Sequence, residues 1–534
     1  MPAGQKIITT LHERRQIEAD LRDMHSSTSH TDFQRRAQQI AALGSQVIPV
    51  IVSTIDRVNR AGMSQTDTRL LEVLGTVAVY LDRDEIVQAL RQVVLGPGHT
   101  DQSRAGAMTI LEQFLDQEPD GELLAGLSNP EGVALSSLEE VLARGEKDPS
   151  VLVEFVQGLD QQEPDIVLAV VGALHAIGDR RAVELLRMVA QDVREEIAAQ
   201  ALQALAGLRL SEAGDALQVL IPVTAPGLRS LAERSLRKLQ FAGVPVGPMS
   251  SAGYRNGSGA PQDWRALISP VDGLGRQSVW FVRGSRSAEQ VKFLNVLLSD
   301  RAGAVEAAGH ERVPVVLLPP RREPGHVHDI PVPGGPGVLL MLEAPFDLGR
   351  RLVLEALARN RETQIPVAAP LRLLSTWLWD VAGAKALPPK RLPQLGPDDR
   401  ALSAASGRLL GHPAFVTWTL QGEQVLQAAQ DLSQRPDWPS QSWSLEVEVA
   451  RLAAELFAEP VVGQLFSRRL ESMSEWLLLA GDEAEARLAL AAAQRFAGGA
   501  PQEHPLIRAM VRRALETALS DLDGSNLEES ETGG

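Results

Sequence analysis

Three histidines and an aspartate in the middle of the chain have side chains of the kind that bind metal ions. His326, His328 and Asp329 lie in the stretch REPGHVHDIPVPGG, and His310 precedes them. Zinc sites use such ligands when the surrounding structure fixes them around the ion. This stretch is rich in proline and glycine and offers no element that would hold the ligands. We therefore predict a loop here and no metal site.

Two other stretches look like ligand-binding loops but lack a required part. DLDGSNLEE (521–529) is acidic like a calcium loop, but its Gly524 comes too early and no helix follows. GLGRQS (273–278) is rich in glycine but lies between two predicted strands, so it lacks the helix N-terminus that would bind a phosphate. We predict an acidic tail and a hairpin turn.

The chain contains no pattern of a known catalytic centre. It has no cysteine, which excludes disulfides, thiolate zinc sites and cysteine nucleophiles. It also lacks the serine-hydrolase, Walker and zinc-protease motifs. The pair Trp377 and Trp379 lies two apart on a predicted helix, so the two rings point to different sides and one could line a pocket or a contact. We predict no cofactor; an enzymatic function is not favoured.

The elements around residues 163–210 are the most regular in the chain. In DIVLAVVGALHAIGD, apolar residues recur at a spacing of three and four, which predicts one buried helical stripe. Its members are Ile166, Val167, Val170, Val171, Leu174 and Ile177. Gly178 ends this helix and Asp179 caps the next one. The unit is a helix, a tight turn and a second helix.

The second helix of this unit, RRAVELLRMVAQ, has an inner and an outer side. Val183, Leu186 and Val189 are predicted to face the core. Simple solvation explains a charged outer side without any function and is favoured over partner binding, which is the alternative. The residues predicted to point outward, and proposed as partner-binding residues, are Arg181, Glu184, Arg187 and Met188.

The stretch AIGDRRAVELLRMVAQDVREEIAAQAL resembles the HEAT repeat, in its short phycobilisome-lyase type. Asp192 and Arg194 stand where that family places its ladder of aspartates and arginines. Weaker copies, such as 35–57 with a turn at Leu43 and Gly44, extend the resemblance over about residues 30–243. It implies an N-terminal α-solenoid of HEAT-like helical pairs, in which each repeat packs only on its neighbours.

The composition divides the chain into further segments. The residues 244–263 are rich in Gly, Ser and Pro and predict a flexible linker after a solenoid over 1–243. The residues 264–345 predict a small α+β module, in which 289–300 could be a strand or a helix, with the strand favoured, and 312–320 is a short strand or extended segment. The remaining segments are a helical C-terminal domain, 346–520, and a disordered acidic tail, 521–534. The fold class is mainly α.

Charge and termini limit the classes of partner. The net charge of −16 disfavours nucleic acid, which requires a positive surface. The N-terminal stretch predicts an amphipathic helix from about Ile7 and no signal peptide, and the longest apolar run, GVLLMLEAPF, is too short to span a membrane. We therefore expect a cytoplasmic protein without membrane or nucleic-acid partners.

Two functional classes remain. The first is a non-enzymatic interaction or scaffold protein that binds another, unknown protein through its helical repeats. The second follows from the resemblance alone, because bilin lyases attach tetrapyrroles to proteins. It is an enzyme, or an accessory of an enzyme, of bilin-lyase type that binds a tetrapyrrole.

Overall fold

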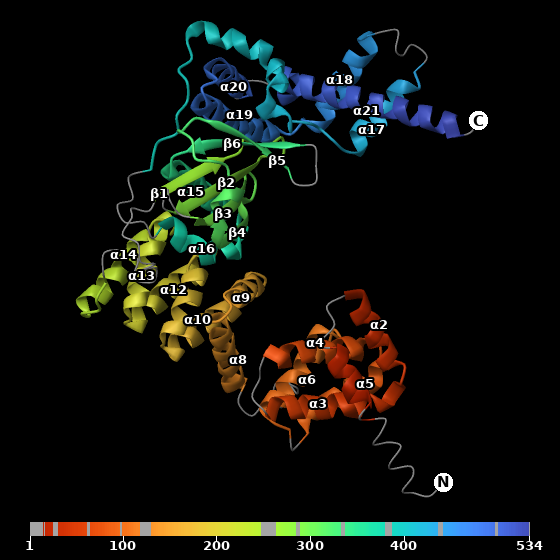
Figure 1. Ribbon diagram of the computed structural model, residues 1–534, viewed down its shortest axis with the longest axis vertical. Coiled ribbons are helices and arrows are strands. Elements are labelled where there is room, and N and C mark those ends of the chain that lie inside the picture. Colours follow the sequence, from red (N-terminus) through yellow and green to blue (C-terminus); the bar gives the residue numbers. More distant parts are fainter. Residues whose placement is uncertain are drawn as a thin grey trace, which may run out of the picture. The chain divides into compact units, whose positions relative to one another are not determined.

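The computed structural model (Figure 1) describes residues 14, 16–24, 30–60, 65–96, 99–117, 130–246, 263–284, 289–332, 337–379, 387–435, 442–496 and 500–532. The protein is mainly helical (66%), and the strands of the described residues form one six-stranded antiparallel sheet in the middle of the chain. The chain divides into two compact units, Met1–Val151 and Leu152–Gly534. The domain limits predicted at residues 243, 263, 345 and 520 stay predictions.

The first unit consists of helices around a shared aliphatic core. Side-chain caps start two of them: Asp82 accepts a hydrogen bond from Glu85 N (3.0 Å), and Thr100 accepts one from Ser103 N (3.2 Å). The turn predicted at Leu43 and Gly44 is present, with Gly44 in the left-handed region (φ 69°). Besides residues 16–24, the helices are α2 (His30–Ala41), α3 (Ile48–Arg60), α4 (Gln65–Val79), α5 (Arg83–Leu95), α6 (Asp101–Gln113) and α8 (Pro130–Gly145).

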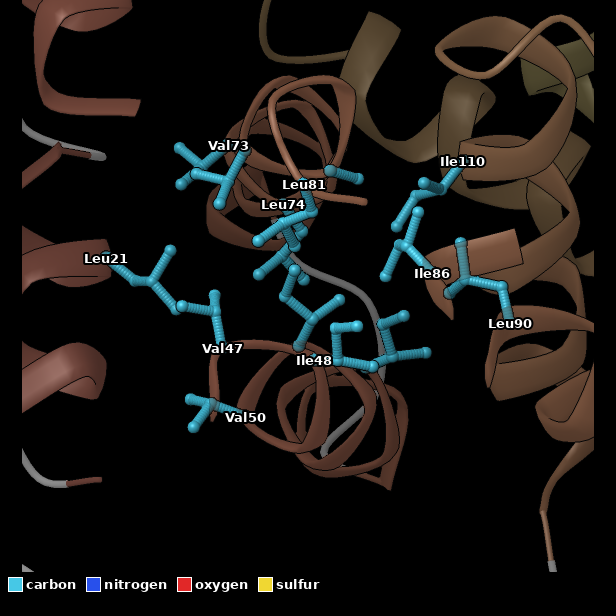
Figure 2. Packing of buried hydrophobic residues seen from close by; sticks show 14 of the residues in the cluster. Leu21, Val47, Ile48, Val50, Val73, Leu74, Leu81, Ile86, Leu90 and Ile110 are labelled. Atoms are coloured by element: carbon cyan, nitrogen blue, oxygen red, sulfur yellow. The ribbon is translucent and has the colours of Figure 1, made fainter. Parts of the chain in front are cut away.

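Branched aliphatic side chains from five of these helices meet in this core. Figure 2 shows side chains such as Val47, Leu74 and Ile86 turned toward a common centre, and all three are fully buried. Ile17 and Leu21 add residues 16–24 to the cluster. The N-terminal helix was predicted from about Ile7, and the part of it before residue 14 lies outside the described residues. No single described helix is long and apolar enough to span a membrane; one pair, Asp32–Ala41 with Gly44–Asp56, meets that test only across a bend of 102°.

The second unit opens with helices that pack in order along the chain. The α10 helix contacts α12, α12 contacts α14, and α11 contacts α13; they lie side by side in yellow in Figure 1. The predicted turn is confirmed, because Gly178 (φ 71°) ends α10 and Asp179 caps α11. The helices are α9 (Ser150–Asp160), α10 (Pro164–Ile177), α11 (Arg180–Val189), α12 (Glu195–Leu208), α13 (Ser211–Leu220) and α14 (Pro226–Phe241).

The sheet has the order β4-β3-β2-β1-β6-β5, with all neighbours antiparallel. The register places Ala266 opposite Phe281 and Phe281 opposite Leu294, so these buried side chains share one face. The favoured prediction of a strand at 289–300 is confirmed. The strands are β1 (Asp263–Ile268), β2 (Arg276–Gly284), β3 (Gln290–Ser299), β4 (Gly303–Pro314), β5 (Val327–Pro331) and β6 (Val338–Ala344).

The strand pattern of 303–344 differs from the prediction. The strand expected near 312–320 is the end of β4, which begins at Gly303 and is followed by the 3-10 turn Val315–Leu317. Proline at 314 cannot donate to a neighbouring strand, and the pairing ends there. The described residues of the predicted α+β module contain strands and this 3-10 turn, whereas the helices that pack on the sheet follow it in the chain.

Two helices after the sheet cover its buried face. They are α15 (Phe346–Thr363), which contacts β1–β4, and α16 (Ala369–Trp379), which contacts β4. Gly349 lets α15 approach closely, because a Cβ there would lie 2.6 Å from Phe281. The helical C-terminal region follows, with 3-10 segments at Pro397–Gly411 and Pro413–Phe415 and the helices α17 (Glu423–Ser433), α18 (Ser442–Leu456), α19 (Pro460–Ala480), α20 (Glu483–Phe496) and α21 (Pro505–Thr532).

The C-terminal residues differ from the predicted disordered tail. The structure continues α21 to Thr532 as one helix. The stretch after residue 520, DLDGSNLEESET, contains a glycine but no proline, so no residue in it is incompatible with a continuing helix.

Candidate functional site

The outer side of α11 is the surface that the sequence proposed for partner binding. The inner side is as predicted: Val183, Leu186 and Val189 are buried. The helix begins at its Asp179 cap, which accepts hydrogen bonds from Arg181 N (2.8 Å) and from the Arg181 side chain. The bond from the Arg181 side chain lowers the pKa of Asp179 below its ordinary value.

Two of the four proposed residues do not point into solvent. The prediction was wrong for Arg187, which is 1% exposed, and for Met188, which is fully buried. Arg181 and Glu184 stay partly exposed. The helix α16 of the same unit lies against this side of α11 and covers it.

Arg187 binds the main chain of α16. Its Nη1 donates to Arg372 O (2.8 Å) and its Nη2 to Leu373 O (2.7 Å); Nη1 also donates to Ser375 Oγ. A backbone carbonyl has two lone pairs, so it can accept from an arginine as well as from its own helix. Glu184 holds the guanidinium from the other side, with Oε2 3.1 Å from Nε.

Gln191 extends this contact beyond the end of α11. Its Nε2 donates to Arg372 O (3.0 Å) and lies 3.4 Å from Ser375 Oγ. The α13 helix contacts α16 as well. The helices α11 and α13, each the second helix of its pair, therefore both contact the helix α16.

An arginine of α16 binds the end of α9, the first helix of this unit. Arg372 is almost completely buried, and its Nη2 lies 2.9 Å from Asp160 Oδ1 at the end of α9. Its Nε donates to Val367 O (2.9 Å). Burial raises the pKa of Asp160, and the nearby Arg372 counteracts this rise.

The sheet holds the other side of α16. A Cβ on Gly309 would lie 2.5 Å from Leu374, so the helix packs directly on β4. Lys292 of β3 lies over the Trp377 ring (4.8 Å), and Arg350 of α15 lies over the Trp379 ring (4.7 Å). Both tryptophans are buried in these contacts.

An ion pair and a hydrogen bond of an arginine side chain hold the turns between the helical pairs. Arg194 Nη2 lies 2.8 Å from Asp192 Oδ2, and Nη1 donates to Gln162 O (2.8 Å) in the preceding turn. The hydrogen bond to Asp192 raises the pKa of Arg194. Nearby, Arg361 of α15 donates to Val223 O (3.1 Å) beside a cavity of about 20 Å³, which is room for one water molecule.

The residues considered as metal ligands lie in different surroundings. His328 Nε2 lies 3.0 Å from Glu343 Oε2, which also binds Arg265 Nη1 (2.9 Å). His310 lies on β4 and His328 on β5, the opposite edges of the sheet. In the part of the chain that the structure describes, no three His, Asp or Glu side chains gather as a metal site would require.

Sequence reasoning missed the residues that bind α11 from the other side, Arg372 and Ser375. A signal for them was present, because Arg372 stands in the otherwise apolar stretch APLRLLSTWLW. A charged residue within an apolar helix needs a buried partner. Comparisons with known protein families, with curated proteins and with solved structures find no match for this chain.

Proposed function

We propose that this chain is a non-enzymatic interaction protein whose N-terminal α-solenoid of HEAT-like helical pairs serves as a scaffold. One observation carries the proposal: α11 and α13, the second helices of two successive pairs, bind the helix α16 along one side. A stack of such pairs offers an extended surface on which a helix of another chain can bind in the same way.

The chemistry of the contact supports a general binding surface. Arg187 and Gln191 bind carbonyl oxygens of the main chain, which every helix has. The pair Asp160 and Arg372 adds one contact that depends on the bound sequence. The bond from Arg194 to the preceding turn agrees with the ladder that the HEAT resemblance implies.

An external partner would use the part of the surface that α16 leaves exposed. Arg181 and Glu184 are the two proposed partner residues that remain partly exposed on α11. Both have polar, hydrogen-bonding side chains, so they would bind a partner that has polar or charged side chains at its rim.

The test is capture of proteins from a lysate of the source cells by the immobilised full chain, read by mass spectrometry. The variant Arg181→Gln with Glu184→Gln removes both charges and leaves an acceptor for Arg187. The matched control, Arg229→Gln with Glu233→Gln, removes an exposed pair from α14. We expect the α11 variant to lose a protein that the wild type and the control capture.

Two results would contradict the proposal at different levels. Capture of no protein above the level of empty beads would contradict the scaffold function. Equal capture by the wild type and both variants would leave the scaffold function and remove Arg181 and Glu184 from the partner surface.

A tetrapyrrole, the ligand of the alternative function, would not fit the cavity beside the turns of the helical pairs. The cavity where α15 contacts the turns of the helical pairs has a volume of about 20 Å³, far below the volume of such a ligand. Addition of a linear tetrapyrrole tests this alternative, because binding would shift the visible absorbance of the pigment.

A further inference from the structure

A larger cavity lies at the other end of the sheet, away from α11. Its volume is about 250 Å³. The walls come from the β1–β2 hairpin loop, the turn after β3, the middle of α15 and the middle of α19, with Lys390 at the side. Segments from four distant parts of the sequence thus converge on one small space.

One arginine fixes the floor of this cavity. Arg469 of α19 is buried, and its Nε lies 2.6 Å from Asp300 Oδ2 in the turn after β3. Its Nη1 donates to Gly273 O (2.6 Å) and its Nη2 to Leu274 O (3.0 Å) in the hairpin loop. The loop, the turn and the helix are therefore held together, and the cavity is formed before any ligand binds.

The carboxylates of the lining are neutralised by neighbours. Asp300 is paired with Arg469 as described, and Glu471 Oε2 lies 3.2 Å from Lys390 Nζ. The third carboxylate, Glu355, binds Arg351 Nη1 at 2.7 Å. The acidic groups of the cavity thus each have a cationic partner.

Two further cations of the lining are not used by these carboxylates. Arg359 of α15 lies 2.6 Å from Glu362, one turn further along the helix, and Glu362 is 62% exposed and outside the lining. Arg468 of α19 is exposed and has no acidic partner among the described residues. Guanidinium groups bind carboxylates and phosphates through two parallel hydrogen bonds.

Part of the remaining wall is apolar, beside polar side chains of the lining such as Gln277. Val271, Leu298 and Ala356 are buried side chains that line the cavity. Sites for drug-sized ligands measure about 300–1,000 Å³, so this smaller cavity suits a molecule with a few carbon atoms. A short apolar body with an oxyanion at its end would match both parts of the lining.

We propose that this cavity binds a small organic oxyanion, a carboxylate or a phosphate on a short carbon chain, with Arg359 and Arg468 as the anion-binding residues. The apolar wall takes the carbon chain, and Arg469 supports the floor without contacting the oxyanion. The proposal is independent of the scaffold function, because it concerns a different surface and a different class of ligand.

Titration calorimetry on the full chain tests the proposal with three probes at constant ionic strength. The probes are glutarate, propyl phosphate and the neutral 1,5-pentanediol. We expect glutarate or propyl phosphate to bind and the diol not to bind; the stronger of the two anions identifies the head group. Absence of binding by both anions at millimolar concentration, or equal binding of the diol, would overturn the proposal.

Variants then locate the site. We expect Arg359→Gln and Arg468→Gln each to weaken binding of the anion about tenfold, the effect of losing one charge-assisted hydrogen-bonded contact. The control Arg234→Gln removes an exposed arginine of α14 and should bind as the wild type does. Wild-type affinity in both cavity variants, or an equal loss in the control, would show that the anion binds elsewhere. The melting temperature without ligand checks that each variant is folded.

Discussion

At the scale of single residues, Arg187 shows how a charge can be buried without a buried counter-ion. Its guanidinium donates to two main-chain carbonyls and to Ser375. Among the described residues the one carboxylate that it contacts, that of Glu184, is 42% exposed. We expect Arg187→Met to lower the free energy of unfolding by about 1.5–3 kcal/mol, the range for hydrogen bonds to a charged group. Urea denaturation measures it, with Arg234→Met as a surface control. Equal stability of both variants would mean that α16 does not rest on this arginine.

A buried histidine gives a second prediction at this scale. His504 Nε2 donates to Ala492 O (3.1 Å), its Nδ1 accepts from Leu506 N (3.2 Å), and its ring stacks on Phe496 (3.9 Å). Both nitrogens are thus used by the neutral ring. Burial lowers the pKa of His504 from 6.5 to about 4.

The lowered pKa sets the sign of the pH dependence. Between about pH 6.5 and pH 4 the unfolded chain binds a proton at His504 that the folded chain does not, so stability falls as the pH falls through this window. The loss should reach about 3 kcal/mol at pH 4. Urea denaturation at pH 7 and pH 4 measures it. In His504→Gln the free energy of unfolding should fall by about 3 kcal/mol less than in the wild type between pH 7 and pH 4. Identical pH profiles of the variant and the wild type would refute the assignment.

At the scale of elements, the β1–β2 hairpin loop depends on one glycine. Gly275 has φ 84°, and a Cβ there would lie 2.1 Å from Asp300 Oδ1. Gly275→Ala should therefore destabilise the protein by about 1–3 kcal/mol. The control Gly172→Ala, in the middle of α10 with open space around it, should instead stabilise by about 0.5–1 kcal/mol. Thermal unfolding of the two variants compares them, and a shift of the same sign in both would contradict this explanation.

Elements whose limits are set by local signals could be predicted from the sequence. Gly178 and Asp179 define the turn between α10 and α11, and the turn-like residues SDRAG (299–303) favoured a strand at 289–300, where β3 forms. The segment 346–520 was predicted to be a helical domain, and within it Pro397–Gly411 forms a 3-10 helix. Its small residues Ser403, Ser406 and Gly407 permit close packing, and Gly407 approaches Ala509 of α21. That outcome depends on packing, which no local pattern reports.

The contact between α11 and α16 and the cavity beside Arg469 could not be predicted from the sequence, for the same reason. Arg187 and Arg372 O are 185 residues apart in the sequence, and Arg469 and Asp300 are 169 apart. The helical period indicates which side of α11 faces its own pair, but it does not indicate that a later helix covers the other side. For this reason Arg187 and Met188 were predicted to be exposed, whereas the inner residues of the same helix were predicted correctly.

At the scale of the whole molecule, the sequence suggested two bodies joined by a flexible linker at 244–263, a segment that lies mostly outside the described residues. The described contacts join the segments on both sides of it within the second unit. The α16 helix lies between α11 and β4, and Arg361 of α15 binds the turn at Val223. The linker is therefore not the only connection between them.

This arrangement makes a testable demand on the cleaved protein. A protease site placed between residues 247 and 262 should be cut while the two fragments stay together on size-exclusion chromatography, because Arg187, Arg372 and Arg361 still join them. Arg187→Met combined with Arg372→Met removes two of these contacts and should let the fragments separate after cleavage. The uncleaved double variant should elute as one folded chain, which controls for unfolding. Separation of the cleaved wild type would show that the linker, and not α16, holds the two segments together.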